Sequence, residues 1–279
     1  MRLPILAVSC CLLLASSAQA VESGSETAAS GKVSATLTYT AKGGAVSSTL
    51  TVSRDGKQVL ERQAGVRACG KQPAEFCGPP SALYGPPAKS LTVRDVNGDG
   101  EPEVIVDFFT GGAHCCTSTD ITYWTSSGYR TRWRDWGNGG YVLKQLDGRG
   151  PLEWVARDDR FAYRFEAYAF SGLPVKVARL SVGRFLFVTD RFKSTLRADA
   201  AEQWKSYLRV RKEGHGRGFA AAWAADQYRL GKRSSALATL RREARAGNLR
   251  GTRSASGADS ATAFIKLMDT QLRRWGFVR

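Results

Sequence analysis

The sequence predicts an α+β fold, in which a mainly antiparallel β region precedes an α-helical C-terminal domain. Up to about residue 190, runs of Val, Leu, Ile and aromatic residues alternate with Ser and Thr and are separated by Gly-rich turns. From about residue 195 the chain is rich in Ala, Leu and Arg at helical spacing. One turn sequence also occurs twice, 50 residues apart. We therefore expect a β domain over 33–190 and a helical domain over 195–279.

The first 20 residues have the layout of a signal peptide. Arg2 precedes an apolar run from Leu3 to Ala15, and Ala18-Gln19-Ala20 offers a cleavage site. The run is too short to span a bilayer, and no later segment approaches the roughly 18 to 20 apolar residues that a span requires. We predict a secreted, periplasmic or cell-envelope protein with no transmembrane segment in the mature chain.

The N-terminal part of the mature chain is predicted to form a small antiparallel meander. Residues 21–32 are rich in Ser, Glu, Gly and Ala, which indicates a flexible lead-in. Strands are expected at Val33–Thr40, Val46–Ser53 and Gln58–Gln63, because each shows alternation and is bounded by turn residues.

Four cysteines remain outside the signal peptide: Cys69, Cys77, Cys115 and Cys116. In an exported protein they are expected to be oxidised, and four cysteines allow three pairings. We favour a local Cys69–Cys77 pair, which leaves the adjacent Cys115 and Cys116 as a vicinal disulfide or as free thiols. Crossed pairs between the two regions are the alternative.

The segment Ser90–Phe109 carries the clearest candidate site. Asp95, Asn97 and Asp99 alternate with other residues, and Gly100 can take the positive φ of a tight loop. Glu103 adds a carboxylate, and a backbone carbonyl at Glu101 adds an oxygen. Calcium takes about 6 to 8 oxygen ligands, which this set and water can supply. The sequence predicts one structural Ca²⁺ site. The alternative is a hairpin turn whose carboxylates are solvated and bind no ion.

The pattern D-x-N-G-D-G-x-x-E followed by an apolar strand resembles the calcium turns of FG-GAP and VCBS repeats, the blades of integrin-like β-propellers, here of a bacterial exported type. An EF-hand loop instead places a Glu at position twelve, which is Val106 in this chain. The match is specific over this loop and weak elsewhere. The resemblance implies a propeller-like β unit stiffened by the ion.

A second turn aligns with the first at the offset of 50 residues. Asp147 aligns with Asn97, and Glu153 aligns with Glu103. Gln145 replaces the first Asp, and Arg149 brings a positive charge where the first turn has Asp99. We predict that this turn keeps the shape and has lost the metal.

Two blade-like units follow from these turns, at about 90–140 and 141–190. Strands of the second unit are expected at Tyr163–Phe170, Pro174–Leu180 and Arg184–Thr189. A closed propeller typically needs 4 to 8 blades, so two units predict an open assembly.

The sequence favours a non-enzymatic protein with a binding or envelope-structural role. It contains neither a G-x-S-x-G elbow, a phosphate loop nor an H-E-x-x-H motif. The alternative is a calcium-dependent envelope hydrolase with His114 as base. His114 beside Cys115 and Cys116 also invites a zinc or redox interpretation, but a rigid corner is favoured.

The basic charge points to a third hypothesis, polyanion or cell-wall binding through the helical domain. The chain carries a net charge of +16, and 20 Lys and Arg face 7 Asp and Glu from Arg191 onward. An acidic cell-envelope polymer or a protein is the candidate partner, and nothing indicates specific nucleic-acid binding. A generic Arg-rich surface that keeps the protein soluble is the favoured explanation of the charge, because the Arg residues are interleaved with Ala and Leu and do not form a tail.

Overall fold

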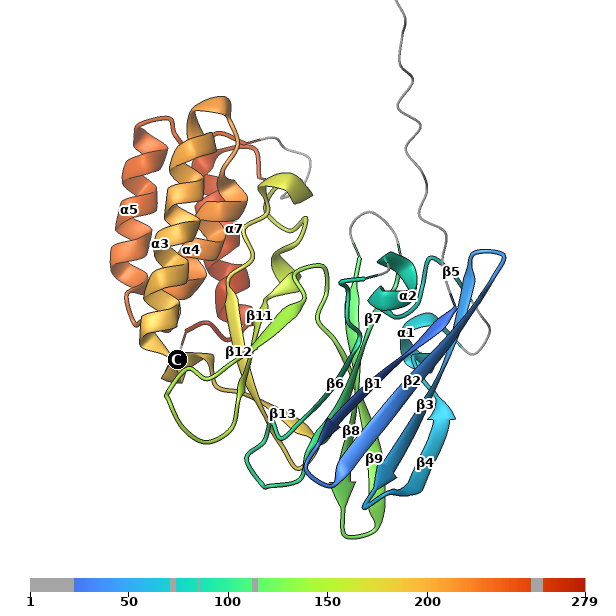
Figure 1. Cartoon of the computed structure of the whole chain (residues 1–279). Helices are drawn as coiled ribbons and strands as arrows, with labels where there is room; N and C mark the ends of the chain where they lie inside the picture. Colours follow the sequence, from blue (N-terminus) through green and yellow to red (C-terminus); the bar gives the residue numbers. More distant parts are fainter. Residues whose placement is uncertain (1–22, 71–73, 85, 112–114, 252–257, 279) are drawn as a thin grey trace, which may run out of the picture.

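The computed structural model describes residues 23–70, 74–84, 86–111, 115–251 and 258–278. Three antiparallel sheets occupy the first part of the chain and a group of helices the last part (Figure 1). In the described residues the sheets do not close into a ring. The predicted α+β class, with an open β assembly before a helical region, is confirmed. The predicted signal peptide lies outside the described residues.

The first sheet is a meander that starts earlier than predicted. Its strands are β1 (Gly24–Ser30), β2 (Val33–Lys42), β3 (Ala45–Arg54) and β4 (Lys57–Gln63) in that order, with β5 (Ala74–Glu75) paired to β3. The segment expected as a flexible lead-in therefore contains a strand. Its ladder to β2 holds β1 in place, and the Glu26 carboxylate also accepts hydrogen bonds from the backbone N–H groups of Ser90 and Leu91.

The second and third sheets are four-stranded and connected in the same way. The second contains β6 (Leu91–Arg94), β7 (Glu103–Phe109), β8 (Thr117–Thr125) and β9 (Gly128–Asp135). The third contains β10 (Tyr141–Lys144), β11 (Glu153–Arg157), β12 (Val175–Ser181) and β13 (Arg184–Phe187). The first two strands of each sheet begin 50 residues apart, at 91 and 141 and at 103 and 153.

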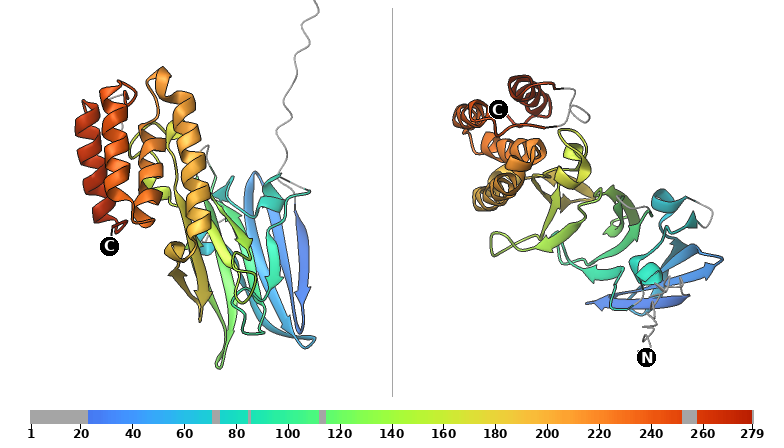
Figure 2. Two further views of the ribbon diagram at one scale, coloured as in Figure 1. Left: turned by 90° about the vertical axis from the view of Figure 1, so that its left-hand side faces the viewer. Right: turned by 90° about the horizontal axis from the view of Figure 1, so that it is seen from above.

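The three sheets pack face to face. The middle sheet takes part in two cores, because alternate residues of a strand point to opposite faces. On β7, Val104, Val106 and Phe108 join the core shared with the first sheet. Ile105 lies between them in sequence and joins the core shared with the third sheet, beside Trp154. Seen from above, the sheets follow one another toward the helices (Figure 2).

Residues 163–170, predicted as a strand, do not form one. The chain between β11 and β12 instead contains two short 3-10 helices, η1 (Asp159–Phe161) and η2 (Tyr168–Phe170). Tyr163 has a positive φ of 57°, and its backbone N–H donates to the Ser171 hydroxyl. Phe161 and Phe165 are buried in the core of the helical domain. Aromatic residues whose pattern predicted a strand therefore anchor the connection between β11 and β12.

Two short helices, α1 (Val66–Cys69) and α2 (Pro80–Tyr84), lie within the β region. The C-terminal region contains η3 (Thr189–Arg191), α3 (Lys193–Val210), η4 (Arg211–Glu213), α4 (Arg217–Arg229), α5 (Arg233–Arg245) and α7 (Ala261–Arg274). Leu196 of α3 packs with Val175 and Val177 of β12, so the helices cover the outer face of the third sheet. Among the described residues, none of the helices is long and apolar enough to cross a membrane.

Candidate metal site

The predicted calcium turn connects β6 to β7, where Arg94 pairs with Glu103. Both Asp95 carboxylate oxygens accept backbone hydrogen bonds, from the N–H of Gly98 at 2.7 Å and of Gly100 at 2.9 Å. Gly98 and Gly100 have φ values of 79° and 84°, a conformation that glycine adopts without strain. Asp95 thus stabilises the turn through hydrogen bonds to its backbone.

Three of the predicted ligand side chains meet at the Asn97 amide. Its Nδ2 donates to Asp99 Oδ2 at 2.9 Å and to Glu103 Oε1 at 2.6 Å. The other Glu103 oxygen accepts a hydrogen bond from the Val96 N–H at 3.0 Å. The turn therefore gathers Asn97, Asp99 and Glu103 around one polar centre.

The Glu101 side chain points away from this centre. Its carboxylate forms ion pairs with Lys32 at 2.6 Å and with Arg54 at 2.7 Å, both on the first sheet. The hydrogen bond from Arg54, and then that from Lys32, lowers the Glu101 pKa to about 2. Only the backbone carbonyl of Glu101, the group that the sequence proposed, is left to face a cation.

Besides Glu101, the turn contains three acidic side chains, those of Asp95, Asp99 and Glu103. Glu103 is buried, and burial raises its pKa to about 7, with Asp99 and Asp95 adding to the rise against the Val96 hydrogen bond. Within the described residues, no Lys or Arg forms an ion pair with Asp95, Asp99 or Glu103. The described residues also contain no group of three or more His, Cys, Asp or Glu side chains already converged on a metal position.

The second turn has the same backbone connection. Lys144 of β10 pairs with Glu153 of β11, as Arg94 pairs with Glu103. The Leu146 N–H donates to Glu153 Oε2 at 2.7 Å, which is the counterpart of the hydrogen bond from Val96 to Glu103. The two turns also touch, because the Leu152 N–H donates to the Val96 carbonyl at 2.9 Å.

A guanidinium group lies between the acidic side chains of the second turn. Arg179 of β12 donates through Nε to Glu153 Oε1 at 2.7 Å, and its Nη2 pairs with both Glu153 and Asp147. These acids align with Glu103 and Asn97 of the first turn. In the second turn Arg179 is thus the cation that contacts these two acids, in addition to the charge of Arg149 that the sequence predicts there.

Sequence reasoning missed Arg179 because it lies 26 residues beyond Glu153 and meets it only through the β11–β12 ladder. Extending the register of the second sheet by one residue places Tyr123 opposite Glu103. Tyr123 cannot supply a positive charge at neutral pH. The first turn thus offers the acids without the built-in cation, and its donor set of carboxylates and an amide suits a hard cation such as Ca²⁺.

Beside the first turn lies an open cavity of about 530 Å³. It is lined by Asn97 and Asp99 of the first turn, Pro151 of the second, and Arg179, Val182 and Arg229 among others. The turn is therefore reachable from solvent.

The cysteines form two local disulfides in the structure, Cys69–Cys77 and Cys115–Cys116. The first pair has its Cα atoms 5.5 Å apart, within the usual range for a disulfide. His114, the base of the hydrolase hypothesis, lies outside the described residues.

The chain resembles two bacterial proteins over about half of its length. It is 31% identical over 163 residues to a protein of Synechocystis described as a "probable thylakoid lumen protein", covering 55% of this chain and 48% of that one. It is 30% identical over 141 residues to an uncharacterized protein of Sinorhizobium fredii, covering 49% and 22% of the two chains. The chain thus spans less than half the length of either relative. No family model matches it, and no solved structure matches.

Proposed function

We propose that this chain is an exported, non-enzymatic protein of the FG-GAP/VCBS type, whose first turn binds one structural Ca²⁺ and whose role is binding or envelope architecture. One observation carries the proposal. Two turns of equivalent backbone connection each gather acidic side chains; within the described residues a guanidinium pairs with Glu153 of the second turn, whereas none pairs with Glu103 of the first.

The ligands of the ion would be Asp95, Asn97, Asp99, Glu103 and the carbonyl of Glu101. Asn97 would have to turn its amide so that Oδ1, and not Nδ2, faces Asp99 and Glu103. The bound ion would supply positive charge at a point where buried Glu103 has none. The expected gain is stiffness of the β6–β7 turn, and no chemical step.

Two features support export. The disulfides Cys69–Cys77 and Cys115–Cys116 fit an oxidising compartment. One relative is described as a probable lumen protein, which is also a compartment beyond a membrane. We infer an envelope or extracellular location, where abundant calcium would keep a weak site of roughly 10⁻⁴ to 10⁻³ M occupied.

The partner class that we propose is an acidic envelope polymer or an acidic protein. A groove of about 720 Å³ between α5 and α7 is lined by Arg241, Arg245 and Lys266 around an apolar floor that includes Leu237 and Ile265. Among the described residues these three cations have no ion pair. Their charge favours an anionic ligand.

Calorimetric titration with CaCl₂ tests the metal proposal, using full-length protein from which metal has been removed with a chelator. We expect one site and a rise in melting temperature, since an ion that binds only the folded state stabilises it. Asp99→Asn should weaken Ca²⁺ binding at least tenfold, because it removes a charged ligand.

Asp147→Asn is the matched control, since it removes an acid from the second turn, and it should leave Ca²⁺ affinity unchanged. Absence of heat and of any thermal shift for the wild-type protein would refute the proposal. Equal losses in the two variants would show that calcium only screens acidic surface.

A further inference from the structure

A second charged cluster lies at the junction between the third sheet and the helices. It contains Arg134 of β9, Arg160 of η1, Lys176 of β12 and Arg229 of α4. Burial lowers the pKa of Lys176, and although Asp158 opposes this, the charges of Arg160, Arg134 and Arg229 lower it further. The four basic side chains are therefore close enough to one another to interact electrostatically.

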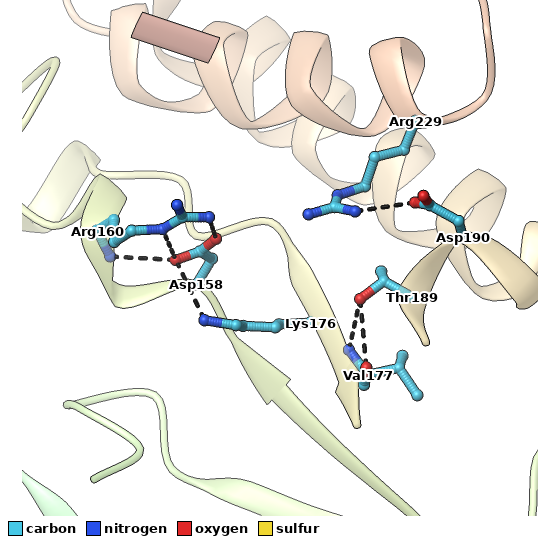
Figure 3. A network of polar contacts seen from close by, with 7 residues as sticks. All are labelled: Asp158, Arg160, Lys176, Val177, Thr189, Asp190 and Arg229. Atoms are coloured by element: carbon cyan, nitrogen blue, oxygen red, sulfur yellow. Dashed lines mark hydrogen bonds and ion pairs between the residues drawn. The ribbon is translucent and has the colours of Figure 1, made fainter. Parts of the chain in front are cut away.

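Two carboxylates balance part of this charge. Asp158, which is buried, accepts hydrogen bonds from Nε and Nη2 of Arg160, and its Oδ1 lies 3.9 Å from Lys176 Nζ. Asp190 accepts a hydrogen bond from Arg229 Nη1 at 2.8 Å. Figure 3 shows the side chains of Arg160, Lys176 and Arg229 directed into the space around Asp158 and Asp190.

Aromatic rings position these cations. The Phe187 ring lies 5.1 Å from the Arg134 guanidinium carbon and 4.5 Å from Lys176 Nζ. The Phe277 ring lies 5.6 Å from Arg160 and 4.4 Å from Arg229. Such contacts favour the charged form of the cations, but a ring face does not replace a hydrogen-bond acceptor for their N–H groups.

Within the described residues, Arg134 is the one of these four cations that forms no ion pair. Its Nε is buried and has no hydrogen-bond partner, and no described carboxylate forms an ion pair with it. A guanidinium has five N–H donors in a planar fork that suits phosphate and carboxylate groups. A buried N–H of such a group, here the Nε of the partly buried Arg134, is unfavourable without an acceptor unless a ligand supplies one.

A small cavity adjoins these groups. It has a volume of about 110 Å³, and Arg134, Asp158, Arg160 and Lys176 line it. Asp135, Asp159 and Arg157 also line it, so four basic side chains face three carboxylates. The cavity has room for one small anionic group and not for a nucleotide.

We propose that this junction cavity binds a single phosphate group, held by Arg134 and Lys176. The site is separate from the calcium turn and does not depend on it. The phosphate belongs either to the free anion or to a lipid headgroup at the envelope, and the two sources require different probes.

The test measures binding of inorganic phosphate to the full-length protein by calorimetry at constant ionic strength set with NaCl. We expect one saturable site, weakened about tenfold or more by Arg134→Met, because charge-assisted hydrogen bonds are the strong ones. Lys176→Met is the second variant, which keeps the test valid if the first does not fold. Arg130→Met, at an exposed position of the same strand β9, is the matched control and should bind phosphate as the wild type does.

A second arm measures cosedimentation with phosphatidylglycerol vesicles and with phosphatidylcholine vesicles. Binding that depends on Arg134 but not on Arg130 supports the site. Binding of vesicles alone then identifies a lipid source, and binding of phosphate alone identifies the free anion. The proposal is overturned if neither probe binds, or if Arg130→Met weakens binding as much as Arg134→Met does.

Discussion

At the scale of single residues, Arg179 distinguishes two otherwise similar turns. Glu153 is fully buried and Asp147 is half-exposed, and the Arg179 guanidinium contacts both. In the first turn the equivalent acids contact the Asn97 amide, which carries no charge. The same backbone thus holds an internal ion pair in one unit and a candidate cation site in the other.

Arg179→Met should destabilise the protein, because it leaves the buried Glu153 carboxylate without its partner. Removing one member of a buried pair typically costs about 3 to 5 kcal/mol. Urea unfolding monitored by fluorescence measures the loss. The double variant Arg179→Met with Glu153→Gln should recover part of it, and an unchanged midpoint in the single variant would contradict the role of the pair.

At the scale of elements, a polar bridge links the second and third sheets. Asp107 of β7 accepts hydrogen bonds from Thr119 of β8 at 2.6 Å and from the Tyr141 hydroxyl of β10 at 3.0 Å. The residue as a whole is half-buried, but its carboxyl group is enclosed by these partners. Burial raises the Asp107 pKa to about 6, against the hydrogen bonds that favour the charged form.

This raised pKa predicts that Asp107 makes stability fall between about pH 4 and pH 6. In that window the folded protein holds a proton that the unfolded chain, with a pKa of about 3.9, has released, so raising the pH favours unfolding. Above pH 6, the free energy of unfolding should be lower than below pH 4 by about 3 kcal/mol on account of Asp107.

Asp107→Asn should remove this contribution, and urea unfolding at a series of pH values in the presence of chelator measures it. The pH profile of the variant should be flatter than that of the wild type. Superimposable profiles would show that Asp107 is ionised throughout.

At the scale of the whole molecule, three sheets and a helical layer form one stack. Each layer shares a core with the next, and the helices complete the last one through Phe192 and Leu196. The third sheet would otherwise present Val175 and Val177 to solvent. The helical region is thus an integral layer of the fold as well as a basic surface.

Leu196→Ala should lower the stability of the whole chain by about 2 to 5 kcal/mol, because it leaves a cavity in this last core. Leu208→Ala on the same helix removes an exposed side chain and should change stability little. Thermal unfolding monitored by near-ultraviolet circular dichroism compares the two variants. Similar melting temperatures would show that the helices and the sheet do not stabilise each other.

The sequence by itself determined the features that depend on neighbouring residues. Alternation and turn residues predicted most of the strands, and the Asp95–Glu103 pattern located the turn and its internal repeat. The same local signals failed at residues 24–30 and 163–170. A polar strand held by its partner shows little alternation of hydrophobicity, and aromatic residues pack equally well in a connection as in a strand.

Only the tertiary structure decided which distant residues meet. Strand register placed Arg179 against Glu153, and stacking of the sheets and helices gathered Arg134, Arg160, Lys176 and Arg229 at one junction. Local patterns follow from backbone geometry over a few residues, whereas these contacts depend on how whole sheets pair and pack. For that reason the acids of the turn were visible in the sequence, and the cation that neutralises the second turn was not.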